Sequence, residues 1–431
     1  MLHKECGCLI SYFRRSIYQT KTFTMKRIPV FLSVICLFLL CKSEVDAQQK
    51  LVYSNDKIKT GAEQTDKYVD YLKGKRVAIL GNQSSVIGKT HLVDSLLALK
   101  INIVKIFGPE HGFRGNASNG TEVSDEVDAK TGIRIISLYG DRRKPAAKDL
   151  ADVDLFIFDV QDMGVRFYTN INTLRDIMEA CADNGKELMI LDRPNPNAYL
   201  IDGPILDMKH KSGIAQFPVP IAHGMTIAEF AQMINGEKWM KAKTTCKLKI
   251  IPVSNYNHSM LYKLPVNPSP NLNTEESILL YPSTCLFEGT KLNHGRGTDY
   301  PFTVIGSPVY KGIYSFSFTP VSKKGMSESP LFMNQVCYGL DLRKVDLAKL
   351  VASKKLNLDW MKELYRKSPE KSAFFDRSFS TQIGSIETLA GVSDFRKQIE
   401  SGASDQEIRK SWEPGLTNYK KMRKKYVIYK D

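Results

Sequence analysis

The chain reads Ile101-Asn102-Ile103-Val104-Lys105-Ile106-Phe107 and then changes to Gly108-Pro109-Glu110-His111-Gly112-Phe113-Arg114-Gly115. The first run is mostly apolar and predicts a short buried strand. Directly after it, glycines separate a carboxylate, an imidazole and a guanidinium, on Glu110, His111 and Arg114. Ligands of open α/β sheets bind at the carboxyl ends of the strands, and glycine lets the backbone approach them closely. This stretch therefore predicts an α/β sheet with a binding site, and Glu110 is its first candidate residue.

Strands and helices alternate through the first half of the chain. Apolar runs predict strands at 76–80, 101–107, 133–138, 153–158 and 187–191, and amphipathic stretches predict helices at 91–99 and 173–182. Thr226 and Glu229 form a capping box that begins a further helix. Strands that alternate with helices at this spacing predict a mostly parallel, doubly wound sheet.

The pattern changes near residue 275. Short β-like pieces and basic helices follow, with helices expected at 342–354, at 358–367 and from Ser404 onward, the last one broken at Pro414-Gly415. Roughly 380 mature residues also favour two domains on length alone. We therefore expect an α/β domain over 48–275 and a smaller α+β domain over 276–431.

The N-terminus has the organisation of a secretory signal peptide. Met25-Lys26-Arg27 begins a basic segment, the apolar run 28–40 follows, and Val45-Asp46-Ala47 provides small residues at the −3 and −1 positions of a cleavage site. We predict that translation starts at Met25 and that residues 1–47 are removed. The apolar run is too short for a comfortable membrane span. An exported protein, periplasmic or secreted and without stable membrane insertion, is the expectation.

The net charge of the chain indicates which classes of partner it can bind. The formal net charge is +15, and removing residues 1–47 takes away seven basic and three acidic residues, which leaves about +11. Such a protein would be attracted to anionic cell-wall polymers or membrane surfaces by its long-range field. Nucleic acid is not expected as a partner, because the predicted compartment is wrong and no recognition motif is present.

Polar residues also follow three other predicted strands. They are Asp159, Gln161, Asp162, Arg166 and Tyr168 after the run 153–158, Asp192, Arg193 and Asn195 after the run 187–191, and His223 after Pro220-Ile221-Ala222. Parallel strands share one direction, so all these ends should open on one edge of the sheet. Each group alone has a structural explanation: Asp159 could cap a helix, Asp192 and Arg193 could form an ion pair, and His223 could be a buried core histidine. Four groups on one edge favour a site.

Several blocks, in one order, resemble the NamZ-type exo-β-N-acetylmuramidases, long known as a domain of unknown function. The blocks are 108–115, Ser137-Leu138-Tyr139-Gly140, 158–168, 191–196, 223–226, Cys285-Leu286-Phe287-Glu288-Gly289-Thr290 and Gly295-Arg296-Gly297-Thr298. The resemblance covers nearly all of the mature chain. It implies a Rossmann-like catalytic domain, a C-terminal auxiliary domain and a cleft between them. It also implies release of N-acetylmuramic acid (MurNAc) from the non-reducing ends of peptidoglycan fragments, with Glu110 as the catalytic residue.

The chain departs from the family pattern in two places. Many relatives carry Ala-Gly-Glu shortly after the first block, where this chain has Ser118-Asn119-Gly120-Thr121-Glu122, so no role is carried over to Glu122. Some relatives have a second glutamate just before Gly-Arg-Gly-Thr, and Asn293-His294 occupies that place here. No second carboxylate is therefore expected from the C-terminal domain.

Cleavage of a glycoside needs a proton donor, and a glutamate with a raised pKa is suited to that role. Asp159 and Asp162 are the expected catalytic partners of Glu110, with Asp192 as a further candidate; alternatively, the acetamido oxygen of the substrate acts as the nucleophile. An arginine fork would bind the lactyl carboxylate of MurNAc. The expected substrate-binding residues are His111, Arg114, Gln161, Arg166, Tyr168, Asp192, Arg193, Asn195, His223 and Arg296.

Metal and cofactor sites are not expected. Glu110, His111, Asp159, Asp162 and His223 could bind a divalent ion, but their spacing is not that of a metal motif. The stretch 81–90 ends in Gly-Lys-Thr, yet six residues separate its glycines where a P-loop has four. Two alternatives stay open: a non-catalytic protein that binds muropeptides, and a metal-assisted hydrolase of another cell-wall bond. The expected substrates are peptidoglycan-derived muropeptides or the disaccharide of MurNAc and N-acetylglucosamine (GlcNAc).

Overall fold

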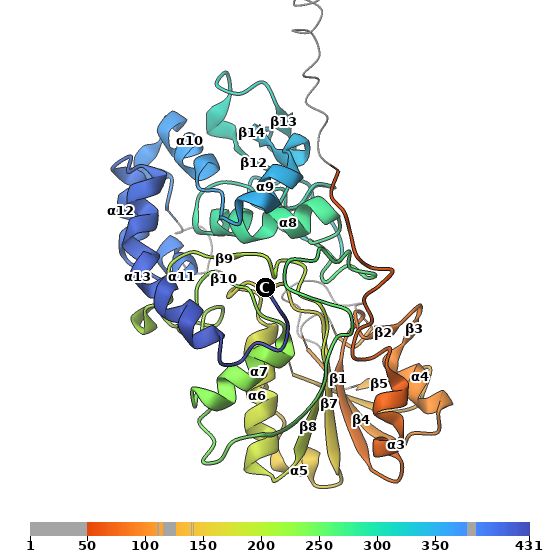
Figure 1. Cartoon of the computed structure of the whole chain (residues 1–431). Helices are drawn as coiled ribbons and strands as arrows, with labels where there is room; N and C mark the ends of the chain where they lie inside the picture. Colours follow the sequence, from red (N-terminus) through yellow and green to blue (C-terminus); the bar gives the residue numbers. More distant parts are fainter. Residues whose placement is uncertain (1–49, 110–111, 115–125, 139, 141, 377–384) are drawn as a thin grey trace, which may run out of the picture. The chain divides into compact units, whose positions relative to one another are not determined.

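The computed structural model describes residues 50–109, 112–114, 126–138, 140, 142–376 and 385–431. A seven-stranded sheet in the order β11-β8-β7-β1-β4-β6-β5 forms its first half (Figure 1). Its strands are β1 (Val77–Gly81), β4 (Ile103–Gly108), β5 (Glu126–Val127), β6 (Arg134–Ser137), β7 (Leu155–Asp159), β8 (Glu187–Leu191) and β11 (Lys247–Ile251). All neighbouring pairs are parallel except β5 with β6. The predicted α/β class is confirmed.

The chain winds outward from the middle of this sheet in both directions. From β1 it moves to β4 and β6 on one side, and it then returns to β7, β8 and β11 on the other side. The connections after β1 and β7 therefore leave in opposite directions. In doubly wound sheets, ligands bind in the crevice at such a switch point, outside the carboxyl ends of the strands.

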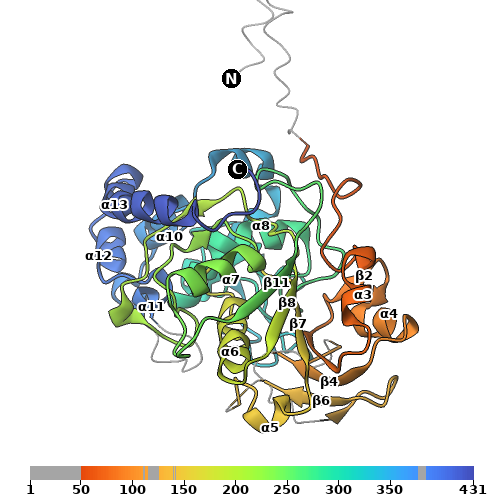
Figure 2. The ribbon, with the colours of Figure 1, turned by 60° about the horizontal axis from the view of Figure 1, so that its bottom comes forward.

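Helices cover both faces of the sheet (Figure 2). Helices α3 (Val69–Leu72) and α4 (Leu92–Ala98) lie on one face, and α6 (Asn170–Asp183) and α7 (Ile227–Gly236) lie on the other. Side chains along β1 alternate between the two cores, because successive residues of a strand point to opposite faces. A strand buried on both faces is expected to be a continuous apolar run, which explains why such runs predicted this sheet.

The second half begins with α8 (Glu275–Thr284) and the short 3-10 helix η3 (Cys285–Gly289). It contains a three-stranded antiparallel sheet in the order β12-β14-β13, made of Val304–Ser307, Cys337–Asp341 and Ser317–Phe318. Its further helices are α9 (Leu347–Ser353), α10 (Asp359–Lys367), α11 (Ile386–Ala390), α12 (Asp394–Glu400) and α13 (Asp405–Arg423). Most of these elements share one hydrophobic core with Val165 and Ile221 of the first half, while β13 packs in a separate small cluster with Val304 and Cys337. No helix within the described ranges is long and apolar enough to cross a membrane.

One local prediction was wrong in this half, and another was confirmed only in part. Helix α13 continues through Pro414 and Gly415, because Ile408 and Trp412 before them and Leu416 after them are buried on one face, which compensates for the hydrogen bond that proline removes. Gly415 allows close packing, since a Cβ there would lie 2.9 Å from Ile205. The helix expected at 342–354 is instead a 3-10 turn, Leu342–Lys344, followed by α9.

The strand before His223 is also not part of the main sheet. Strand β10 (Ala222–His223) pairs antiparallel with β9 (Ile201–Asp202) in a separate two-stranded sheet. We expected His223 to lie at the carboxyl end of a parallel strand, and this prediction was wrong. A run as short as Pro220-Ile221-Ala222 contains no information about its pairing partner, and this pairing is fixed only by tertiary contacts.

Candidate active site

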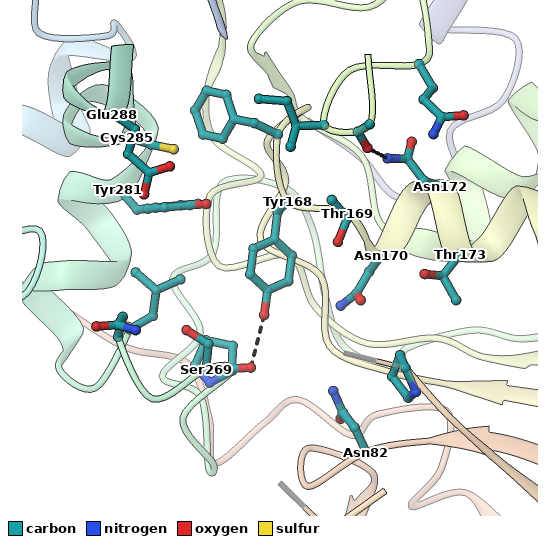
Figure 3. Close-up of a pocket in the computed structure, with 18 of the residues that line it drawn as sticks. Asn82, Tyr168, Thr169, Asn170, Asn172, Thr173, Ser269, Tyr281, Cys285 and Glu288 are labelled. Carbon is teal, nitrogen blue, oxygen red and sulfur yellow. Dashed lines mark hydrogen bonds between the residues drawn. The ribbon is translucent and has the colours of Figure 1, made fainter. Parts of the chain in front are cut away.

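A cavity of ≈ 450 Å³ lies at the carboxyl ends of the parallel strands. Residues that directly follow β1, β4 and β6 line it, namely Asn82, Pro109 and Leu138. The start of α6 contributes Asn170, Asn172 and Thr173, and the second half contributes Tyr281, Cys285, Glu288, Arg296 and Phe302. Figure 3 shows Tyr281, Cys285 and Glu288 on one side of Tyr168, and Asn170, Asn172 and Thr173 on the other. The size is typical of a small-molecule site.

Amide side chains offer hydrogen-bond acceptors in this cavity. Asn172 donates from Nδ2 to the carbonyl of Gly213 over 3.0 Å, and Asn271 donates to the carbonyl of Met326 over 2.9 Å. Both side chains are at least nine-tenths buried, and within the described ranges neither Oδ1 atom has a partner. Buried acceptors are costly unless they are satisfied. The two oxygens are therefore suited to a ligand that carries O–H or N–H groups.

Glu288 is the carboxylate of the opposite wall. Its Oε1 accepts from Nη2 of Arg296 over 2.6 Å and from Nε over 3.2 Å, and Nε2 of His294 lies 3.3 Å away. Burial raises the pKa of Glu288, but Arg296 and His294 lower it by more, and the net pKa is about 2. Glu288 is consequently ionised at neutral pH. All three of these contacts are made by Oε1.

Aromatic rings make up much of the rest of the wall. The Tyr168 hydroxyl donates to the carbonyl of Pro268 over 3.0 Å, and its ring lies edge-on to Tyr281 at 6.2 Å. Tyr281 in turn packs against Phe302 at 4.9 Å. Such rings give a sugar an apolar surface beside polar groups that fix its orientation. Tyr168 is thus a predicted substrate-binding residue that the structure places at the cavity.

Glu110 and His111 lie outside the described residues. Pro109, the residue immediately before Glu110, lines the cavity. Arg114 does not line it. The Arg114 guanidinium contacts Asp128 over 2.7 Å and Asp94 over 3.2 Å, and it lies over the ring of Phe113.

Asp159 and Arg193 form a buried ion pair. Arg193 donates from Nε and Nη2 to the two oxygens of Asp159 over 2.6 and 2.9 Å, and it also donates to the carbonyl of Val86 over 3.1 Å. Both side chains are almost fully buried, and neither lines the cavity. The pair holds the ends of β7 and β8 together. Arg193 thus forms a structural ion pair, but its partner is Asp159 and not Asp192.

Asp162 and His223 face each other in the interior. The backbone amide of Met225 donates to Nδ1 of His223 over 3.3 Å, which places the proton of a neutral ring on Nε2. That atom lies 3.6 Å from Oδ2 of Asp162, which also accepts from the amide of Gly164 over 2.7 Å. Gly164 has a φ of +73° and lies so close to Asn195 that a Cβ would collide with it. Asp162 and His223 are not among the residues that line the cavity.

Gln161, Asn195 and Asp192 hold backbone groups. Gln161 donates to the carbonyls of Asp162 and Pro194, each over 2.8 Å, and Asn195 donates to Met225 over 3.0 Å. Asp192 caps the N-terminus of α7, where its Oδ1 accepts from the amide of Ala228 over 3.0 Å. These side chains shape the loops at the strand ends, and they do not line the cavity themselves.

Arg166 has no acidic partner within the described ranges. Its guanidinium is fully buried and donates to four carbonyls, those of Pro204, Val219, Leu389 and Ala390, over 2.7 to 3.0 Å. Burial lowers its pKa to about 9. This side chain joins the first half of the chain to α11, and it does not line the cavity.

Several cavity residues were missed in the sequence. Asn82 belongs to the stretch dismissed as a false P-loop, and Glu288 belongs to a matched block in which it received no role. We expected no carboxylate from the second half, yet Glu288 provides one, six residues before the position considered. Within the described ranges, no group of three or more His, Cys, Asp or Glu side chains could hold a metal ion.

Both halves of the chain match the same family of known proteins. The family model "Exo-beta-N-acetylmuramidase NamZ, N-terminal" matches residues 77–276, and the corresponding C-terminal model matches residues 279–429. A curated relative, the peptidoglycan beta-N-acetylmuramidase NamZ of Bacillus subtilis, is 36% identical over 425 residues, which cover 94% of this chain and 100% of the relative.

Two solved structures of DUF1343 family proteins from Bacteroides fragilis are also similar. The first is 43% identical with a TM-score of 0.79, and the match covers 87% of this chain and 99% of the other. The second is 26% identical with a TM-score of 0.69, and the match covers 88% and 100% of the two chains. The arrangement of both halves described above is thus shared with these solved structures.

Proposed function

The chain belongs to the NamZ family of exo-β-N-acetylmuramidases, and we propose that the cavity described above is where it holds and cleaves its substrate. The protein is a glycosidase that releases MurNAc from the non-reducing ends of peptidoglycan fragments.

One observation supports the site more than any other: Pro109 lines the cavity, and Glu110 is the next residue of the chain. We propose that Glu110 is the general acid. It donates its proton to the glycosidic oxygen while the bond from that oxygen to C1 of MurNAc breaks. A water molecule then supplies the hydroxyl at C1, and its second proton restores Glu110. The products are free MurNAc and a glycan shortened by one sugar.

We further propose that Glu288 is the second carboxylate of the reaction. With a pKa of about 2 it is ionised and is not a proton donor, but Oε2 can accept a hydrogen bond or stabilise positive charge at C1. Asp159 and Asp162 are less suited, since both are held by interior contacts away from the cavity wall. Glu288 is compatible with a direct role and equally with orienting the acetamido group of the substrate.

The disaccharide MurNAc–GlcNAc is the smallest substrate that we propose, acted on without a metal ion. The signal-peptide organisation of residues 1–47 supports export to the periplasm or beyond. Those residues lie outside the described part of the chain. In that compartment, peptidoglycan fragments are within reach of the enzyme.

Incubation of the full protein with β-linked MurNAc–GlcNAc, with and without EDTA, tests this proposal. We expect equal amounts of free MurNAc and GlcNAc, at the same rate under both conditions. The matched control is GlcNAc–MurNAc, in which MurNAc is at the reducing end and which should stay intact. Binding without cleavage would favour the muropeptide-binding alternative. Activity that EDTA removes and Zn²⁺ or Mn²⁺ restores would favour a metal-assisted hydrolase.

A further inference from the structure

The arginines expected to bind the lactyl carboxylate are all engaged within the protein. Arg114 contacts Asp94 and Asp128, Arg193 contacts Asp159, and Arg296 contacts Glu288, while Arg166 is enclosed by four carbonyls. Arg114, Arg166 and Arg193 do not line the cavity, and recruiting any of them would break contacts that are already satisfied. Arg296 does line the cavity, but Glu288 offsets its charge.

Arg143 is in a different situation. It lines the cavity from the loop between β6 and α5 (Ala147–Leu150), and its side chain is exposed. In the part of the chain that the structure describes, Arg143 makes one hydrogen bond, a long one of 3.4 Å from Nε to the carbonyl of Gly140 in the same loop. Within the described ranges, no carboxylate forms an ion pair with it. A guanidinium that is accessible and has no carboxylate partner is available to a ligand.

The surroundings of Arg143 fit a ligand that carries a carboxylate. A Cβ on Gly213 would lie 3.8 Å from Nη1 of Arg143, so the guanidinium lies next to this glycine. The carbonyl of Gly213 accepts the hydrogen bond from Asn172, and the Oδ1 atom of Asn172 has no donor among the described residues. Asp176 also lines this part of the cavity, but Arg175 contacts it over 2.5 Å and offsets its charge. Among the described residues, therefore, no carboxylate near Arg143 is left to neutralise its positive charge.

We propose that Arg143 binds a carboxylate of the muramoyl unit and so determines the specificity for MurNAc over GlcNAc, an inference that rests on the proposed function. The two sugars differ by a lactyl ether on O3, which ends in a carboxylate. Arginine binds a carboxylate through two parallel hydrogen bonds, which gives geometric selectivity as well as affinity. In a fragment with a peptide stem the lactyl group is an amide, and the nearest carboxylates belong to the stem.

Binding of free MurNAc tests this without any turnover. We would measure the dissociation constants of MurNAc and GlcNAc by calorimetry for the wild type, Arg143→Gln and Arg143→Lys. Exposed Lys148 is in the next helix, and Lys148→Gln is the matched control for loss of one positive charge. Arg143→Gln should weaken MurNAc binding roughly 10- to 100-fold and leave GlcNAc binding unchanged. Arg143→Lys should recover part of the loss, and Lys148→Gln should bind normally.

Two further ligands identify the source of the carboxylate. With the methyl ester of the MurNAc lactyl group, wild type and Arg143→Gln should bind equally, because no carboxylate remains. If the mutation instead weakens binding of MurNAc-peptide alone, the carboxylate recognised belongs to the stem, and the proposal that Arg143 selects MurNAc over GlcNAc is overturned. Equal binding of MurNAc by wild type and Arg143→Gln, or no binding of MurNAc by the wild type, would overturn the proposal.

The failure of this inference can be told apart from that of the proposed function. If the wild type cleaves MurNAc–GlcNAc and Arg143→Gln does so with unchanged kcat/KM, the role of Arg143 is wrong and the glycosidase stands. If Arg143 controls MurNAc binding but no disaccharide is cleaved, the catalytic proposal alone is wrong. Melting temperatures of all variants show whether each one is folded, and an exposed position should leave them unchanged.

Discussion

The hydroxyl of Tyr429 donates a hydrogen bond of 2.6 Å to Oδ2 of Asp192, which ties the end of β8 to the third residue from the C-terminus. The same hydroxyl accepts from the amide of Val253 over 2.8 Å. Burial raises the pKa of Asp192 to about 7, even though Tyr429 and the amide of Ala228 favour its ionised form. The C-terminal residues thus help to hold one of the strand ends beside the site.

The pKa of Asp192 predicts how stability changes with pH. A folded-state pKa of about 7 against 3.8 means that the folded protein binds more protons between these values, so unfolding becomes easier as pH rises from about 4 to about 7. The full pKa shift corresponds to a loss of about 4 kcal/mol in the free energy of unfolding. Asp192→Asn removes this dependence. Urea unfolding of both proteins between pH 4 and pH 8 should show the wild type losing stability relative to the variant, and a constant difference would contradict the assignment.

Arg166 should stabilise the fold rather than bind substrate. Arg166→Met leaves four buried carbonyls without their donor, and we expect a loss of roughly 3–5 kcal/mol in the free energy of unfolding. The KM of the folded fraction should stay at the wild-type value. Denaturant unfolding and steady-state kinetics check the two statements. A stable variant with a raised KM would instead show that Arg166 contacts the substrate.

Glu288 should act through its charge. Glu288→Gln keeps the shape of the side chain but removes the ionised oxygen, and we expect kcat to fall roughly 10²–10³-fold, as when a group that stabilises transition-state charge is lost. Cys285→Ala, on the preceding turn and also at the cavity, is the matched control and should change kcat little. If the kcat of Glu288→Gln stays within threefold of the wild-type value, Glu288 has no direct role in the reaction.

Strands were predictable here because burial on both faces produces apolar runs. The strands expected at 101–107, 153–158 and 187–191 correspond to β4, β7 and β8, each within about two residues. The helix through Pro414 was not predictable, because a local rule against proline was overridden by a buried face that only the folded chain brings together.

The sequence indicated the edge of the sheet at which the cavity lies, but it indicated few of the residues that line the cavity. Glycines and charges after β4 and β7 indicated the correct edge of the sheet, because parallel strands end together. Which charges are satisfied internally depends on partners far away in sequence, as with Arg193 and Asp159, 34 residues apart. The same reason explains why Glu288 and Arg143 were missed. Their approach to the cavity is set by the packing of η3, which carries Glu288, and of the loop before α5, and no local pattern encodes it.

The direct test of the central claim is the release of MurNAc from MurNAc–GlcNAc by Glu110→Gln, measured beside the wild type. Both proteins should have the same melting temperature, since the substitution changes one proton donor and not the shape of the side chain. We predict a rate lower by about 10²–10⁴-fold, the usual effect of losing a general acid. A folded Glu110→Gln variant that keeps more than about a tenth of wild-type turnover would contradict this account and assign the proton donor to another residue.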